Sequence, residues 1–145
     1  MGAGAALAVS CDFRIATPPS IIGFPPAKLG ITYPQRAVRQ LIDLVGVGRA
    51  RAMLLKARTY SAAEAFDAGL VDSVVESMPN GVADVAAQFA STSALTVRNL
   101  KKSIIRAQDE PDRDNDDLVE SCVESGDFYE GVHAFLERRP ASFRP

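Results

Sequence analysis

The turn Gly2-Ala3-Gly4 is the first place where residue types and spacing could support chemistry. It opens a predicted helix rich in alanine and leucine, and a helix N-terminus presents unpaired N–H groups and a partial positive charge. The two glycines let a ligand approach the backbone closely. A dinucleotide-binding fingerprint is excluded, because Leu7 stands where the third glycine belongs and no strand precedes the turn. The pattern therefore indicates either a site for developing negative charge or a small-residue helix that only packs tightly.

Other chemically capable side chains are few. The single histidine, His133, falls on the last predicted helix, where we expect it to face solvent, with catalysis as the less favoured alternative. Cys11 and Cys122 have neither metal-ligand spacing nor a framework of pairs. These features predict no metal site and a reduced, cytoplasmic setting.

Length and composition indicate one globular chain with a sizeable core. Of the 145 residues, 47% are hydrophobic and 23% are charged, and the formal net charge is −2. A net negative charge provides no overall positive potential that would attract nucleic acid. No apolar run approaches the roughly 18 residues that a membrane span needs. The small, apolar start of the chain, residues 1–11, lacks the basic region and the length of a secretory signal. We therefore expect neither nucleic acid nor a membrane as a partner.

The hydrophobic pattern predicts a mixed first part and a helical second part. Alternation and flanking prolines predict three strands, and helical spacing predicts three helices before residue 60; the strands are 12–17, 20–24 and 70–75, and the helices are 2–10, about 35–45 and 48–57. Gly46 is expected to end the second of these helices. Residues 78–81 are expected to form a turn or linker.

Three further sequence signals place helix ends and a loop. Ser61 and Glu64 form a predicted capping box, and Gly69 is expected to take the left-handed position that ends this short helix. Asp127 and Glu130 resemble a second capping box at the last helix. The acid-rich run 109–117 is expected to be a solvated loop.

The order of several short motifs resembles that of the enoyl-CoA hydratase/isomerase (crotonase) family. Each motif is weak alone, but together they extend over essentially the whole chain; they are Gly2–Ala8, Cys11–Ala16, Gly23–Pro25, Lys28–Ile31, Leu44–Gly46, Ala62–Ala65, Ala68–Val71, and a tail signature from Glu130 to Phe143. The resemblance implies an α/β fold. Residues 1–77 would form the C-terminal part of a ββα spiral whose N-terminal half is absent, and residues 78–145 a helical oligomerisation or capping region.

The same resemblance implies a binding mode for an acyl-CoA thioester. The N–H group of Ala3 matches one of the two donors of the family's oxyanion hole, and Gly2 and Gly4 would admit the substrate. Such preorganised donors typically contribute several kcal/mol. Phe135 and Arg138 match positions that contact the CoA of a neighbouring subunit, and the forked Arg138 suits a phosphate. The alternative is that Phe135 is a core residue and Arg138 a solvated charge.

The sequence departs from the family at both catalytic glutamates. Ala6 and Pro26 stand at these positions, so neither can transfer a proton, although Pro26 would still line the substrate pocket. Tyr33, in a loop expected to face the acyl pocket, and Asp72 are possible substitutes. Their alternatives are a tyrosine at the edge of the core and a surface acid.

Two functions remain open from the sequence. The first is an enzyme of the hydratase/isomerase type that acts on acyl-CoA through an oxyanion hole. The second is a truncated, non-catalytic subunit that binds acyl-CoA or supports assembly. In both cases the resemblance implies no cofactor beyond the CoA of the substrate, and a homo-oligomer, either a trimer or a hexamer.

Overall fold

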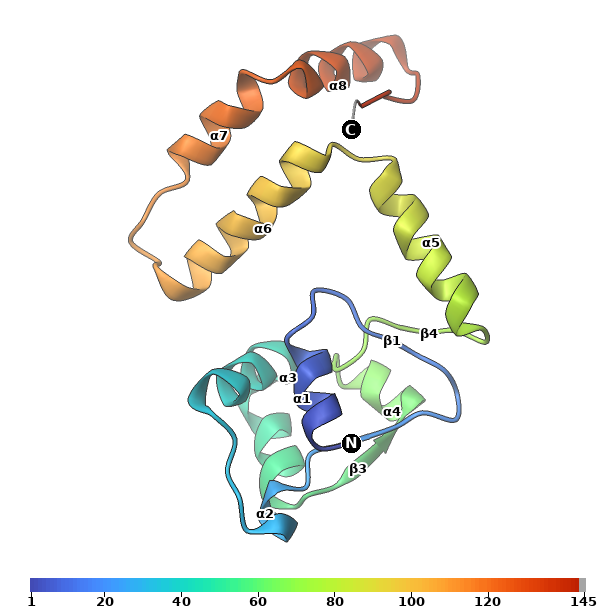
Figure 1. Ribbon diagram of the computed structural model, residues 1–145, viewed down its shortest axis with the longest axis vertical. Coiled ribbons are helices and arrows are strands. Elements are labelled where there is room, and N and C mark those ends of the chain that lie inside the picture. The colour runs from blue at the N-terminus through green and yellow to red at the C-terminus, as the bar shows by residue number, and fades with distance from the viewer. Residues whose placement is uncertain (144–145) are drawn as a thin grey trace. The chain divides into compact units, whose positions relative to one another are not determined.

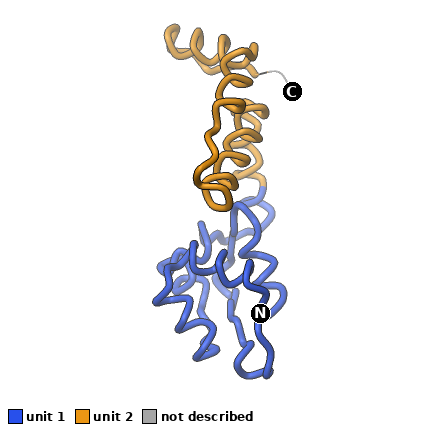
Figure 2. The backbone as a smooth tube through the Cα atoms, turned by 90° about the vertical axis from the view of Figure 1, so that its left-hand side faces the viewer, with its two compact units in different colours: residues 1–82 blue, residues 83–145 orange. Residues whose placement is uncertain are grey.

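The computed structural model describes residues 1–143, which divide into two compact units (Figure 2). Unit 1 is Met1–Val82, and unit 2 begins at Ala83. The boundary falls inside helix α5 (Met78–Ala90), whose first residue coincides with the start of the predicted second region. The last two residues of that predicted region lie outside the described part of the chain. No helix within residues 1–143 is long and apolar enough to cross a membrane.

Unit 1 is a mixed α/β unit with two small two-stranded sheets. Figure 1 labels most of its helices and strands. Its elements are α1 (Ala3–Val9), β1 (Ile15–Ala16), β2 (Ile21–Gly23), α2 (Pro26–Leu29), α3 (Gln35–Leu55), β3 (Thr59–Ser61), α4 (Ala62–Asp67) and β4 (Ser73–Val74). Strand β1 pairs in parallel with β4, with Ile15 opposite Ser73. Strand β2 pairs antiparallel with β3, with Ile22 opposite Tyr60. The predicted α/β class is therefore confirmed.

The core of unit 1 lies between α1, α3, α4 and the strands. Leu41 and Met53 from α3 and Leu70 after α4 are its largest fully buried side chains. Gly46 has φ 74° and ψ 156°, so α3 consists of two helical segments joined at a kink. This agrees with the prediction that Gly46 ends one helix before another begins.

Helix α4 has the predicted cap at each end. Ser61 Oγ accepts from Glu64 N at 3.3 Å, and Ser61 N donates to Glu64 Oε2 at 2.9 Å. At the other end Gly69 has φ 75°, and Leu70 N donates to Ala65 O at 2.8 Å, the six-residue closure of a Schellman motif. An added Cβ at Gly69 would lie 3.3 Å from the Leu44 carbonyl oxygen, so glycine is required for space as well as for φ.

Several elements differ from the predictions in detail. The prolines that follow the predicted strand 20–24 do lie beyond strand β2, but Pro26 also begins the unpredicted helix α2. Pro79 lies in the first turn of α5 and not in a turn or linker. Proline suits both places, because the first turn of a helix does not use its N–H groups. Strand β3 was missed because it is only three residues long and its last residue, Ser61, is also the N-cap of α4. The strands at 15–16 and 73–74 are shorter than predicted, since only these residues pair.

Unit 2 is helical. After α5 come α6 (Ala94–Asp109), α7 (Asp116–Val123) and α8 (Gly126–Glu137). The predicted capping box of the last helix is wrong. Ser125 is the N-cap of α8 and accepts from Phe128 N at 3.2 Å, whereas Asp127 accepts from Ser93 Oγ at 2.5 Å. Ser93 is itself the N-cap of α6, so this bond joins the first turns of two helices.

Candidate functional site

The Gly2-Ala3-Gly4 turn has unpaired helix N–H groups and is fixed in place. Gly2 is the N-cap of α1 with φ 61°, a conformation that favours glycine, and no side chain caps this helix. Gly2 N donates to Gly23 O at 2.9 Å, which anchors the turn to the end of β2. Ala3 and Gly4 are exposed. The turn is therefore anchored at Gly2, while its first-turn N–H groups remain available to a ligand.

The two positions at which the resemblance predicts catalytic acids, Ala6 and Pro26, lie in these same two segments. Ala6 is half-buried on α1, and its N–H donates to Gly2 O at 3.0 Å. Pro26 is buried at the start of α2, three residues after Gly23. The Gly2–Gly23 hydrogen bond joins the start of α1, which carries Ala6, to the end of β2, which leads to Pro26. Neither side chain can donate or accept a proton.

Tyr33 packs at the edge of the unit 1 core. It is half-buried, and its ring meets Phe24 edge to face, with centroids 6.3 Å apart and an interplanar angle of 87°. Phe24 directly follows β2, so Tyr33 lies against the segment that leads to Pro26. This arrangement fits the expectation of a tyrosine at the edge of the core.

Asp72 is held by a buried arginine. Arg14 Nη2 lies 3.0 Å from Asp72 Oδ1, and Arg14 N donates to Asp72 Oδ2 at 2.6 Å. The same guanidinium donates to Leu70 O at 2.9 Å and to Cys11 O at 2.7 Å. Arg14 thus joins the segment after α1 to the segment after α4. Its position within the Cys11–Ala16 motif was visible in the sequence, but its partners were not.

Phe135 and Arg138 belong to unit 2. Phe135 is 82% exposed and lines an apolar groove with a volume of about 640 Å³. Residues from α6, α7, α8 and the tail line this groove, among them Val97, Leu100 and Phe143. Arg138 is exposed and ends α8 with φ 55°. His133 is also exposed on α8, as the sequence predicted.

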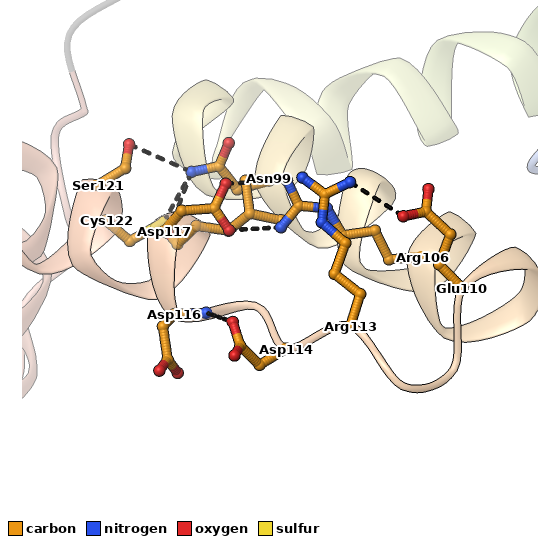
Figure 3. Close-up of polar contacts among 10 residues, drawn as sticks. Asn99, Arg106, Glu110, Arg113, Asp114, Asp116, Asp117, Ser121 and Cys122 are labelled. Carbon is orange, nitrogen blue, oxygen red and sulfur yellow. Dashed lines mark hydrogen bonds and ion pairs between the residues drawn. The ribbon is translucent and has the colours of Figure 1, made fainter.

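Polar contacts between α6 and α7 form a second feature that the sequence did not indicate (Figure 3). Asn99 is 5% exposed and donates to Leu118 O at 3.3 Å, within reach of Cys122 Sγ. Arg106 binds both carboxylate oxygens of Asp117, one of them at 2.8 Å. The Arg106 guanidinium lowers the pKa of Asp117 to about 2. These contacts join α6 to α7, the two helices on either side of the loop between them.

Acid should weaken unit 2 in a defined pH window. The Asp117 carboxyl and the Glu130 carboxyl, which binds Arg139 and Ser142 N, both have pKa values lowered to about 2 in the folded chain. Because the folded pKa lies below the ordinary values of 3.8 and 4.5, this stabilisation is present above about pH 4.5 and is lost as the pH falls toward 2. We expect Asp117→Asn with Glu130→Gln to flatten the fall in unfolding free energy there, measured by urea unfolding. Asp112→Asn, an exposed acid in the same loop, is the control; equal slopes in all three proteins would contradict the assignment.

The geometry defines an α/β unit with an anchored helix N-terminus, followed by a helical unit. The chain matches the family model for enoyl-CoA hydratase/isomerase over residues 1–145 and belongs to this family. It is 37% identical over 150 residues to a crotonyl-CoA hydratase of Syntrophomonas wolfei, covering 99% of this chain and 57% of the relative. It is 33% identical over 146 residues to a short-chain-enoyl-CoA hydratase of Clostridium acetobutylicum, covering 96% of this chain and 56% of the relative.

Solved structures agree. An enoyl-CoA hydratase/isomerase family protein from Hyphomonas neptunium superposes with a TM-score of 0.88 at 33% identity, covering 99% of this chain and 56% of that chain. Another family member gives a TM-score of 0.91 at 34% identity, covering 100% of this chain and 56% of that chain. The predicted crotonase-like fold is confirmed, and the chain spans a little more than half the length of these relatives.

Proposed function

We propose that this chain binds acyl-CoA thioesters, with the Ala3 N–H group holding the thioester oxygen. The observation that carries the proposal is the anchored, uncapped turn: Gly2 bonds to Gly23, and the first-turn N–H groups of α1 lack a side-chain cap. Gly2 and Gly4 leave space for the ligand, since an added Cβ at either would meet no atom within 4 Å. Family membership supplies the substrate class.

The proposed chemistry is that of an oxyanion site without its usual acids. The relatives are named as hydratases of enoyl-CoA and crotonyl-CoA. In this chain Ala6 and Pro26 occupy the expected positions of the catalytic glutamates, so electrostatic stabilisation of the thioester would remain while proton transfer would not. The alternative function is a non-catalytic subunit that binds acyl-CoA or supports assembly.

Tyr33 and Asp72 remain proposed substitutes for the missing acids, and the contacts favour Tyr33. Both oxygens of Asp72 are engaged by Arg14 through its side chain and its backbone N–H. Both carboxylate oxygens of Asp72 are therefore already occupied as hydrogen-bond acceptors within the chain. The Tyr33 ring is fixed against Phe24, and a fixed phenol could donate a proton near the end of β2.

The helical unit is proposed to contribute to CoA binding and to assembly as a homo-oligomer, either a trimer or a hexamer. Phe135 and Arg138 are the proposed CoA contacts, because both are exposed at the end of α8. Several large apolar side chains of the described chain are exposed, including Leu136 at 70% and Leu55 at 73%. Such surfaces support burial in an assembly. A cytoplasmic location is part of the same proposal.

Removing one N–H group tests the binding proposal directly. Ala3→Pro deletes the N–H at the first position of α1, where a helix tolerates proline. We expect the affinity for crotonyl-CoA, measured by titration calorimetry on the purified chain, to fall about tenfold, the effect of one lost hydrogen bond to the thioester oxygen. Ala3→Ser keeps the N–H and should bind as the unmodified chain does. Equal affinity for the proline and serine variants would exclude Ala3 from the site.

A further inference from the structure

The tail of the described chain folds back along α8. Residues 139–143, here named the strap, follow the left-handed Arg138 that ends this helix. Arg139 N donates to Ala134 O at 3.0 Å. The Arg139 guanidinium forks onto Glu130, with Nη1 2.6 Å from Oε1 and Nη2 3.0 Å from Oε2. One carboxylate on α8 therefore holds the beginning of the strap.

The same carboxylate also holds the middle of the strap. Ser142 N donates to Glu130 Oε1 at 2.7 Å, twelve residues along the chain. Arg139 makes a separate contact, from Nε to Glu137 Oε2 at 2.7 Å. Glu130 is the acceptor that joins the two ends of the turn 139–142.

These contacts place Phe143 at the apolar groove. Its half-buried side chain lines the groove together with Phe128 and Val132 of α8. The Phe143 ring lies over Gly131, where an added Cβ would be 3.8 Å from the ring, an ordinary van der Waals contact. The aromatic end of the strap thus forms part of the groove wall without being interlocked with it.

We propose that the strap is a displaceable cover of this groove and that Glu130 is its latch. The polar contacts that join the strap to Glu130 are open to solvent: the Arg139 side chain is 40% exposed and the Glu130 side chain 26%, so water can replace these bonds. Since the strap has no helix or strand of its own, it can open while α8 stays folded. Opening removes the Phe143 wall and increases the accessible apolar surface between α6 and α8.

Glu130→Ala in the full chain tests the latch. We expect the Ser142 amide to exchange its hydrogen with solvent about tenfold faster, because its acceptor and the Arg139 fork are lost together. The fluorescence of an apolar dye, anilinonaphthalene sulfonate, should increase as the groove opens. Glu137→Ala is the matched control on the same helix: it removes a contact to Arg139 but leaves both oxygens of Glu130 in place, so it should change neither signal.

Phe143→Ala separates the cover from the latch. This variant should raise dye fluorescence while Ser142 keeps its slow exchange, because Glu130 still holds the backbone. Circular dichroism checks that each variant keeps its helix content. If Glu130→Ala loses helix, Phe143→Ala still tests whether the strap covers the groove. Unchanged Ser142 exchange in a folded Glu130→Ala chain, or unchanged dye fluorescence in Phe143→Ala, would overturn the proposal.

Discussion

Restoring two carboxylates, by Ala6→Glu with Pro26→Glu, is expected to raise the hydration of crotonyl-CoA by at least about 10²-fold, since each general acid or base contributes about 10²- to 10⁴-fold. The gain is expected because the anchored turn already presents the Ala3 N–H group, whereas Ala6 and Pro26 cannot transfer protons. Glutamate is also acceptable at the first position of α2. The measurement is a steady-state assay of crotonyl-CoA hydration.

Two comparisons make this result decisive. Ala6→Gln with Pro26→Gln has the same shape without the ionisable groups and should stay at the level of the unmodified chain. Pro26→Glu alone should favour isomerisation, since one base suffices for a proton shift. If the unmodified chain turned over on the order of 10² s⁻¹, the range of working enzymes, the roles assigned to Ala6 and Pro26 would be wrong. Loss of such activity in Tyr33→Phe would then assign the proton transfer to Tyr33.

Arg14→Met is expected to lower the free energy of unfolding of unit 1 by about 2–4 kcal/mol. The side chain of Arg14 is 7% exposed, and its removal leaves the carbonyls of Leu70 and Cys11 without this donor. Asp72 loses the donor to Oδ1 and keeps only the backbone N–H of residue 14 at Oδ2. The cost is moderated because the Asp72 side chain is 41% exposed and can bind water. Methionine preserves the apolar stem, so the loss reports the hydrogen bonds more than the packing.

Urea unfolding measures this effect, with Arg58→Met as the control in the same unit. Arg58 pairs with Glu64, but both side chains are about half exposed, at 56% and 45%. Such a pair contributes less than about 1 kcal/mol. Equal destabilisation by the two substitutions would show that Arg14 is no more important than a surface ion pair.

The local structure of unit 1 followed closely from the sequence. The capping box at Ser61, the left-handed Gly69 and the break at Gly46 were all predicted, because caps and positive φ depend on a few neighbouring residues. Short strands were harder to predict. Strand β3, Thr59–Ser61, exists because β2 pairs with it, and its three residues carry no local strand pattern, since the last of them is the cap of α4.

The sequence by itself determined the family, the α/β class, and the absence of carboxylates at Ala6 and Pro26, because these depend only on residue identity and order. Tertiary structure decided which groups meet. Asp72 binds Arg14 across 58 positions of the chain, and Glu130 binds Ser142 across 12. Neither contact produces a periodic pattern in the sequence. From the sequence alone, a charged residue is predicted to lie at the surface, because its partner is distant in the chain. The strap and its latch were therefore visible only in the folded chain.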